Sequence, residues 1–198
     1  MTVRAGFADP VLDAQRVFRA VLEAMAHPGR VVGLPGPDAP PGPDAPPPLG
    51  PATAAVCLTL LDLDTPVWLD AAAATADVVA YLRFHCGAPL VGTAAAARFA
   101  VIADAASMPA FGTFEPGSDE RPDLSATLVI QVAGLAGGRG ARLTGPGIEG
   151  DTRLEVGGAP GLWPGLRANA GRFPRGVDVV LCAGSRLAAL PRTTAVEG

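Results

Sequence analysis

The stretch ATLVIQVAGL (residues 126–135) decides the fold, because it is almost continuously apolar and rich in β-branched residues. A strand that is covered on both faces has such a continuous apolar sequence, whereas a half-exposed strand alternates apolar and polar residues. RFAVIADA (98–105) and GVDVVLCAG (176–184) have the same character. The three stretches predict buried strands of one mixed sheet with helices on both faces, a three-layer αβα arrangement of the α/β class.

The helix expected to begin this fold is DPVLDAQRVFRAVLEAMAHPG (9–29). Asp9 is a favourable N-cap and Pro10 suits the first helical position, while Pro28 and Gly29 end the pattern. Its apolar residues recur at helical spacing and predict a buried stripe. That stripe comprises Ala14, Val17, Phe18, Val21, Leu22 and Met25.

Three further helices are expected along the chain. ATAAVCLTLLDLD (52–64) is apolar nearly all round, which is typical of a buried helix. The next helix runs from about Thr75 to Cys86, and another lies around LWPGLRANAGRF (162–173). The short piece DTPVWLD (64–70) is expected to be extended.

The remaining segments are interpreted as loops and turns of a single domain. GLPGPDAPPGPDAPPPLGP (33–51) contains GPDAPP twice, and proline at this density favours a solvated polyproline II loop. A proline-rich ligand for a partner is the alternative. Residues 106–123 are expected to form a surface loop, and residues 137–156 to form hairpin-like strands.

Composition excludes several classes of function. All fifteen basic residues are arginine, so no lysine can form a pyridoxal phosphate aldimine or complete a Walker A motif. The formal net charge is −4 without a basic run, which argues against nucleic-acid binding. With only two histidines, composition argues against a histidine-rich metal site, and we expect neither a cofactor nor a metal.

The same composition indicates where the protein works. No apolar run reaches the roughly 18 residues that span a bilayer, and the first residues lack the apolar core of a signal peptide. Three cysteines, odd in number and far apart in sequence, favour reduced thiols. We therefore expect a cytoplasmic protein without membrane contact.

LRFHCGAPL (82–90) holds the most reactive residue types of the chain, His85 beside Cys86. A cysteine activated by histidine would be a nucleophile, but neighbours on a helix point about 100° apart. Gly87 suits a helix C-terminus and Pro89 stops the helix, so the helix-end interpretation is favoured over a catalytic dyad.

Two glycine-rich motifs invite a phosphate-binding interpretation. GPGIEG (145–150) matches the dinucleotide fingerprint in letters, but a strand-like segment follows it where the fingerprint requires a helix. GGRGAR (137–142) places Arg139 and Arg142 beside flexible backbone, where they could hold a phosphate. A hairpin turn with exposed arginines is the simpler alternative.

Two proline–arginine motifs supply the other candidate residues. FPRGVD (173–178) contains Arg175 and Asp178. LPRTTAVEG (190–198) contains Arg192, Thr193 and Thr194, which could form an oxyanion clamp or an interface patch. The alternative is an edge strand with a pinned tail. No pair of acidic residues is fixed at a catalytic separation, and no catalytic residue is assigned.

Seven segments, taken in order from residue 7 to 197, resemble the PhnH subunit of bacterial carbon–phosphorus lyase. They are PVLDAQRVFRAVLEAMAHPG, LTLLDLDTPVWL, LRFHCGAPLV, ATLVIQVAGLAGGR, RLTGPGI, FPRGVDVVL and LPRTTAVE. DTPVWL, LRFH and PRTT together are the specific part of the resemblance. The GPDAPP repeat and residues 106–123 lie outside it.

The resemblance implies a role in a complex with PhnG, PhnI and PhnJ that lets bacteria use phosphonates. In its first step, methylphosphonate displaces adenine from ATP and a ribose 1-phosphonate 5-triphosphate forms. The resemblance also implies a homodimer in isolation and a fold similar to pyridoxal phosphate-dependent transferases, without the cofactor. The resemblance assigns no catalytic role to the PhnH subunit, so we expect a structural or substrate-binding subunit. The alternatives kept open are a nucleotide- or phosphonate-binding module and a stand-alone cysteine enzyme.

Overall fold

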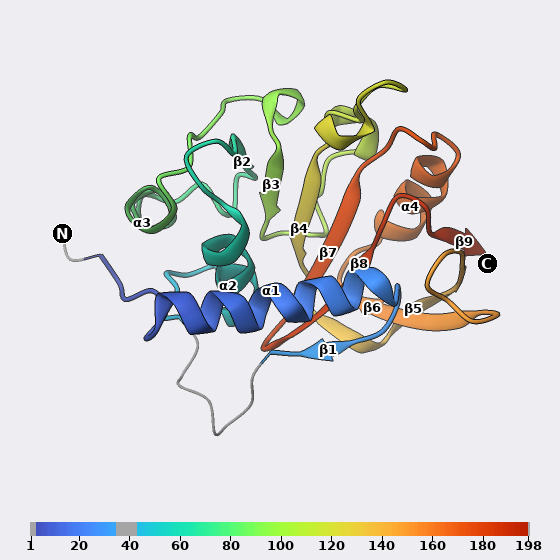
Figure 1. Cartoon of the computed structure of the whole chain (residues 1–198), viewed down its shortest axis with the longest axis horizontal. Coiled ribbons are helices and arrows are strands. Elements are labelled where there is room, and N and C mark those ends of the chain that lie inside the picture. The colour runs from blue at the N-terminus through green and yellow to red at the C-terminus, as the bar shows by residue number, and fades with distance from the viewer. Residues whose placement is uncertain (1–2, 35–42, 198) are drawn as a thin grey trace.

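A six-stranded mixed sheet forms the centre of the molecule in this computed structural model, which describes residues 3–34 and 43–197. The strand order is β1-β8-β7-β4-β3-β2 (Figure 1). The four strands β2, β3, β4 and β7 are parallel. At one edge, β8 pairs antiparallel with β7, and β1 pairs antiparallel with β8. The strand bounds are Val32–Gly33 (β1), Val67–Leu69 (β2), Phe99–Ile102 (β3), Thr127–Gln131 (β4), Asp178–Ala183 (β7) and Arg186–Leu190 (β8).

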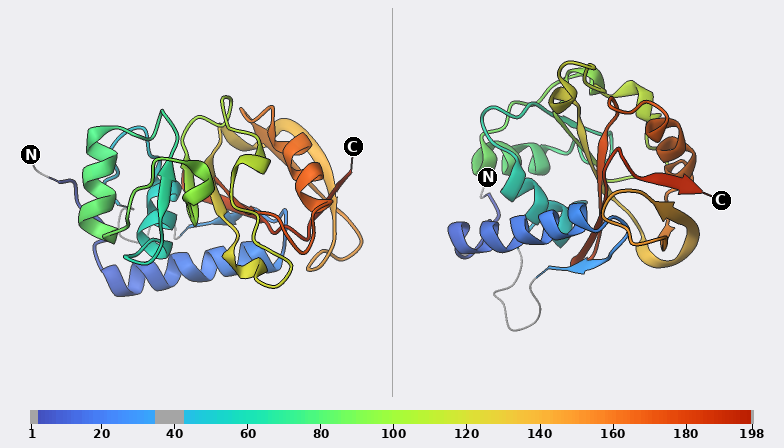
Figure 2. Two further views of the ribbon diagram at one scale, coloured as in Figure 1. Left: turned by 90° about the horizontal axis from the view of Figure 1, so that it is seen from above. Right: turned by 45° about the vertical axis from the view of Figure 1, so that its right-hand side comes forward.

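Helices cover one face of this sheet, and a helix with a second sheet covers the other (Figure 2). The first face carries α1 (Pro10–Ala26), α2 (Pro51–Leu60) and α3 (Ala76–Cys86). The second carries α4 (Leu162–Ala170) and the antiparallel sheet β6-β5-β9. The bounds of those strands are Gly134–Thr144 (β5), Thr152–Gly157 (β6) and Ala195–Glu197 (β9). The predicted α/β class and the hairpin at 137–156 are confirmed.

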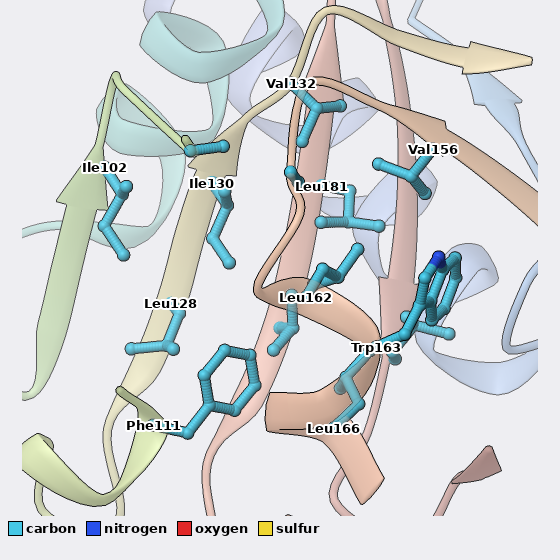
Figure 3. Packing of buried hydrophobic residues seen from close by; sticks show 14 of the residues in the cluster. Ile102, Phe111, Leu128, Ile130, Val132, Val156, Leu162, Trp163, Leu166 and Leu181 are labelled. Atoms are coloured by element: carbon cyan, nitrogen blue, oxygen red, sulfur yellow. The ribbon is translucent and has the colours of Figure 1, made fainter. Parts of the chain in front are cut away.

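The strand sequences divide their side chains between these two layers. Leu128 and Ile130 of β4 pack with Leu162 and Leu166 of α4 in the larger core, whose packing Figure 3 shows. Val129, between them on β4, belongs to the core beneath α1 and α2. Alternate residues therefore meet opposite layers, which is why these strands are apolar at every position.

The helix boundaries follow the predicted caps closely. Asp9 caps α1 by accepting hydrogen bonds from the backbone N–H groups of Val11 (3.1 Å) and Leu12 (3.0 Å). Thr75 caps α3 through Val78 N–H (3.2 Å), and Gly87 ends it with a left-handed φ of 66°. Gly87 therefore occupies a conformation that a residue with a side chain rarely adopts.

The predicted inward stripe of α1 is partly wrong. Phe18 is 45% exposed and Leu22 is 51% exposed, while the alanines at 20 and 24 are buried. Ala20 and Ala24 pack in one cluster with Ala52 and Ala55 of α2 and Ala189 of β8. Small residues on both sides let α1 approach closely, so α1 turns its small face inward and leaves larger side chains outside.

Two predicted surface loops are more deeply packed than expected. Residues 106–123 are mostly loop, with the 3-10 helix Phe111–Thr113 and the start of a second, Pro122–Leu124, and Phe111 and Phe114 are 5% and 1% exposed and join the larger core. Of the predicted loop 33–51, residues 35–42 lie outside the described part, Pro51 already begins α2, and Leu49 is buried at 5%. Apolar anchors within proline-rich sequence thus fasten these segments to the core.

Candidate functional site

An ion pair between Asp178 and Arg192 lies at the amino end of the parallel strands. β7 begins at Asp178 and β8 ends at Leu190, and their antiparallel register brings Arg192 alongside the start of β7. Asp178 Oδ1 accepts from the backbone N–H (2.8 Å) and Nε (3.2 Å) of Arg192, and Oδ2 accepts from Nη2 (2.5 Å). Arg192 Nη1 donates to the carbonyl of Pro122 (2.6 Å). The pair therefore joins three segments at this edge.

A cavity of about 340 Å³ opens beside this ion pair. It is lined by Pro122, Asp123, Phe173, Pro174, Asp178, Pro191, Arg192 and Thr193. Asp123 is held by Arg121 at 2.9 Å, and Asp178 by Arg192, so both carboxylates of the cavity are already engaged. What the cavity offers a ligand is mainly apolar contact with proline rings and Phe173, which is 62% exposed.

The two threonines of the PRTT motif lie in different surroundings. Thr193 lines the cavity, whereas Thr194 is 3% exposed and its hydroxyl has no hydrogen-bond partner among the described residues. The backbone N–H of Thr194 donates to Pro191 O (2.9 Å), which closes a turn before β9. The predicted strand with a pinned tail is therefore present, because β9 pairs with β5.

The other candidate arginines do not line this cavity. Arg142 on β5 contacts Asp151 (3.1 Å) and Glu197 (3.3 Å); the hydrogen bond to Asp151 and the charges of both acids raise the pKa of its guanidinium. Arg175 pairs with Asp119 at 3.2 Å. Arg139 is exposed, and no described residue pairs with its guanidinium. A phosphate would therefore compete with acids at Arg142 and Arg175, but not at Arg139.

At the end of α3, the side chains of His85 and Cys86 contact different partners and not each other. His85 Nε2 lies 2.9 Å from the carbonyl oxygen of Arg4, and its ring packs on Tyr81 with centroids 4.6 Å apart. Cys86 Sγ contacts Cys57 O at 3.7 Å. The helix-end interpretation is confirmed, and His85 fastens the N-terminal segment to α3.

The three cysteines are thiols whose pKa values are raised. Burial raises the pKa of Cys86 to about 11 and that of Cys182 to about 12, and burial together with the neighbouring thiols raises the pKa of Cys57. A catalytic cysteine needs the opposite shift, because the thiolate is the nucleophile. The geometry therefore gives a stand-alone cysteine enzyme no support.

At the carboxyl end of the parallel strands, the polar side chains bond to the chain itself. Asp70, after β2, accepts from the backbone N–H groups of Ala73 (2.7 Å) and Asp104 (2.9 Å). Gln131, at the end of β4, accepts from Gly50 N–H (2.6 Å) and Thr53 Oγ1 (3.0 Å) and donates to Pro48 O (2.9 Å). Open α/β sheets usually bind ligands at this edge. Here Asp70 and Gln131 hold the loops instead.

Comparison with known proteins decides the family. The sequence profile of the family described as "Bacterial phosphonate metabolism protein (PhnH)" matches residues 5–197. The chain belongs to the PhnH family. It is 42% identical over 192 residues to the alpha-D-ribose 1-methylphosphonate 5-triphosphate synthase subunit PhnH of Rhizobium meliloti, covering 96% of this chain and 94% of that protein. It is 35% identical over 186 residues to the putative C-P lyase subunit protein HtxG of Stutzerimonas stutzeri, covering 92% and 85%.

The PhnH match includes the glycine motif GPGIEG, in which Gly145 and Gly147 allow close packing. A Cβ on Gly147 would lie 2.2 Å from the carbonyl oxygen of Ala26, and one on Gly29 would lie 2.8 Å from Leu143 and Thr152 side chains. β6 follows the motif, which confirms the predicted strand at the place where a dinucleotide fingerprint requires a helix. A second cavity of about 420 Å³ lies beside this contact, between His27 and Arg30 on one side and Glu149 and Asp151 on the other.

Two absences can be stated for residues 3–34 and 43–197. No group of three or more histidine, cysteine, aspartate or glutamate side chains there could hold a metal ion. No helix in that part of the chain is both long enough and apolar enough to cross a bilayer.

The sequence did not indicate Gln131 or Asp70 as anchors, nor Phe173 as a cavity wall. Gln131 is a polar residue at the end of an apolar run, and its partners are 78 to 83 residues away. No local pattern encodes such a contact. The Phe-Pro step before Arg175 was the available signal for Phe173, since large apolar residues in exposed turns often line a surface cavity.

Proposed function

We propose that this chain is a non-catalytic subunit of the carbon–phosphorus lyase core complex, assembling with PhnG, PhnI and PhnJ. In this role it is needed, with PhnG and PhnI, for transfer of ribose 5-triphosphate from ATP to methylphosphonate with release of adenine. Its similarity to a named PhnH subunit extends over 96% of the chain.

The non-catalytic part of the proposal rests on the hydrogen bonds of the polar side chains at the carboxyl end of the parallel strands. Asp70 and Gln131, which stand where α/β enzymes place their catalytic groups, have their oxygen atoms bonded to backbone groups and Thr53. The raised thiol pKa values add to this, because no described cysteine is a ready nucleophile.

Co-expression with PhnG, PhnI and PhnJ from the same genome, followed by size-exclusion chromatography, tests the assembly. We expect all four chains in one peak that persists at moderate salt. Elution of this chain as a separate dimer, with the other three together, would contradict the proposal.

The second candidate function is binding of ATP or a phosphonate, favoured by the unpaired guanidinium of Arg139 in the described chain. A ligand present at 100 times its Kd stabilises the folded state by about 2.7 kcal/mol. A rise in the thermal midpoint with millimolar ATP or methylphosphonate, lost in Arg139→Ala, would support it. An unchanged midpoint for the wild-type protein would remove it.

The same proposal extends to properties implied by the family resemblance. We expect the isolated chain to be a cytoplasmic homodimer with a fold similar to pyridoxal phosphate-dependent transferases. The sequence has no lysine to hold that cofactor covalently, so we propose that none is bound. Sedimentation velocity of the isolated chain and an absorbance scan after incubation with pyridoxal phosphate test these two points.

A further inference from the structure

The outer face of α1 concentrates the exposed apolar side chains of the molecule. Seven large apolar side chains of the described chain are markedly exposed, and four of them lie on α1. Val11 (76%), Phe18 (45%) and Leu22 (51%) are spaced by seven and four residues, so they follow one face of the helix. We call these three residues the α1 stripe. It runs for about 17 Å at 1.5 Å per residue.

The α1 stripe is separate from the residues that attach α1 to the sheet. Val17, Ala20, Val21 and Ala24 already fill the contact with α2 and β8. The stripe therefore keeps 45–76% of each side chain's surface exposed, although three adjacent large apolar residues are costly to leave in water. In the left panel of Figure 2, α1 runs along one side of the molecule.

A row of two residues borders the stripe and carries a positive charge. Leu12 (48% exposed) and Arg19 lie seven residues apart on the same side of the helix. Within the described residues, no acid pairs with the Arg19 guanidinium, whereas Arg16 pairs with Asp13 at 3.0 Å. Among the described residues, the face therefore presents an apolar stripe with the unpaired cation of Arg19 at its border.

The charges distinguish a different chain from a second copy of this one. The acids of α1 and its cap are all engaged: Asp9 caps the helix, Asp13 holds Arg16, and Glu23 holds Arg30 at 3.0 Å. A second α1 would cover the stripe but would bring no free carboxylate to Arg19. A complementary partner supplies both an apolar ridge and an acid.

We propose that the α1 stripe is the docking surface for an amphipathic helix of another subunit, with apolar residues against Val11, Phe18 and Leu22 and a carboxylate opposite Arg19. Apolar side chains repeated along a helix are the usual receiving surface for a second helix. This inference rests on the proposed function, since the partner is sought among PhnG, PhnI and PhnJ.

A membrane surface fits the same face less well. Helices that lie on membranes usually carry many basic residues on the polar face. Asp13 and Glu23 balance Arg16 and Arg19 on α1, and an acidic lipid surface would repel those acids.

The test measures binding of the purified full-length chain to a co-expressed PhnG–PhnI–PhnJ assembly. Phe18→Asp should raise the Kd on the order of 30-fold or more, as at an interface hot spot. Phe84→Asp is the matched control, because Phe84 is a 71% exposed phenylalanine on α3. Arg19→Glu should weaken binding roughly 10-fold, whereas Arg16→Glu, on the same helix, should leave the Kd within about twofold.

The outcomes distinguish failure of the docking proposal from failure of the proposed function. Loss of binding in Phe18→Asp and Arg19→Glu, with both controls bound, supports the α1 stripe. Should Phe18→Asp lower the thermal midpoint by more than a few degrees, Val11→Asp, at the more exposed position, replaces it. Wild-type affinity in the stripe variants overturns the inference while the proposed function stands. Failure of the wild-type chain to bind overturns both.

Two further results would also overturn it. The first is stripe-dependent loss of self-association without loss of subunit binding, which would make a second copy the occupant. The second is stripe-dependent binding to vesicles of phosphatidylcholine and phosphatidylglycerol, which would make a lipid surface the occupant.

Discussion

The two ends of the parallel strands use polar side chains differently. At the carboxyl end, Asp70 is 7% exposed and accepts backbone N–H groups from two loops. At the amino end, the Asp178–Arg192 pair is 22% and 15% exposed and borders an open cavity of about 340 Å³. Open α/β sheets usually bind ligands at the carboxyl end of their strands, but here Asp70 at that end connects two loops. At the amino end, the ion pair borders an accessible cavity.

The difference teaches that the position of an edge in the sheet does not by itself determine function. What matters is whether the polar atoms there are still available to form hydrogen bonds with a ligand. Both oxygens of the Asp70 carboxylate are occupied by the chain itself, so this carboxylate has little to give a substrate. Substitutions at each end of the strands test this difference.

Asp70→Ala should have the largest effect on stability. It leaves the N–H groups of Ala73 and Asp104 without their acceptor, which should lower the free energy of unfolding by about 3 kcal/mol. Asp70→Asn keeps one accepting oxygen and should cost about half as much. Urea denaturation of the three proteins measures this. An unchanged midpoint for Asp70→Ala would mean that the carboxylate is free for another role.

Slow alkylation of Cys86 is the second expected effect. A pKa of about 11, against 9.0 for an ordinary cysteine, leaves roughly a hundredth of the thiolate at neutral pH. Iodoacetamide at pH 7.5 should label the native protein on the order of 100-fold more slowly than the urea-unfolded protein. The stability that this raised pKa contributes is present below pH 9 and is lost as the pH rises through 11. Rapid labelling of Cys86 at pH 7.5 would reopen the nucleophile hypothesis.

Arg192→Ala should cost less than Asp70→Ala. It removes an ion pair that is partly exposed to water and the hydrogen bond to Pro122 O, for a loss of about 2 kcal/mol. Arg192→Lys restores charge but not the two-pronged contact, so it should recover only part of the loss. Thermal unfolding measures both variants. Full recovery by lysine would show that charge alone matters at this edge.

Asp119→Ala should have the smallest effect, because its ion pair with Arg175 joins two side chains that are 72% and 50% exposed. We expect a change in unfolding free energy of less than about 0.5 kcal/mol. The same urea series detects it. A loss above 1 kcal/mol would indicate that the pair organises the loop beside the amino-edge cavity.

Local chemistry explains what could be predicted from the sequence. Asp9, Thr75 and Gly87 act through backbone groups a few residues away, so the ends of α1 and α3 followed from short motifs. Apolar runs likewise located β3, β4 and β7 within a few residues. β8 was missed, because RLAAL is rich in alanine and gives no strand signal by itself.

The candidate site was only partly predictable for a different reason. Arg192 and Asp178 were both singled out, but only the β7–β8 register brings them into contact. The anchoring roles of Asp70 and Gln131 depend on contacts up to 83 residues apart. The exposed stripe of α1 depended on which apolar face packs inward, which periodicity alone does not decide.

Release of adenine from ATP in the presence of methylphosphonate, with and without this chain, tests the central claim most directly. We expect no adenine from the chain alone and none from PhnG and PhnI without it. Adding the purified chain back to PhnG and PhnI should restore the reaction. Adenine release by the chain alone would contradict the account, because it would require a catalytic centre where Asp70 and Gln131 are held by the chain's own backbone.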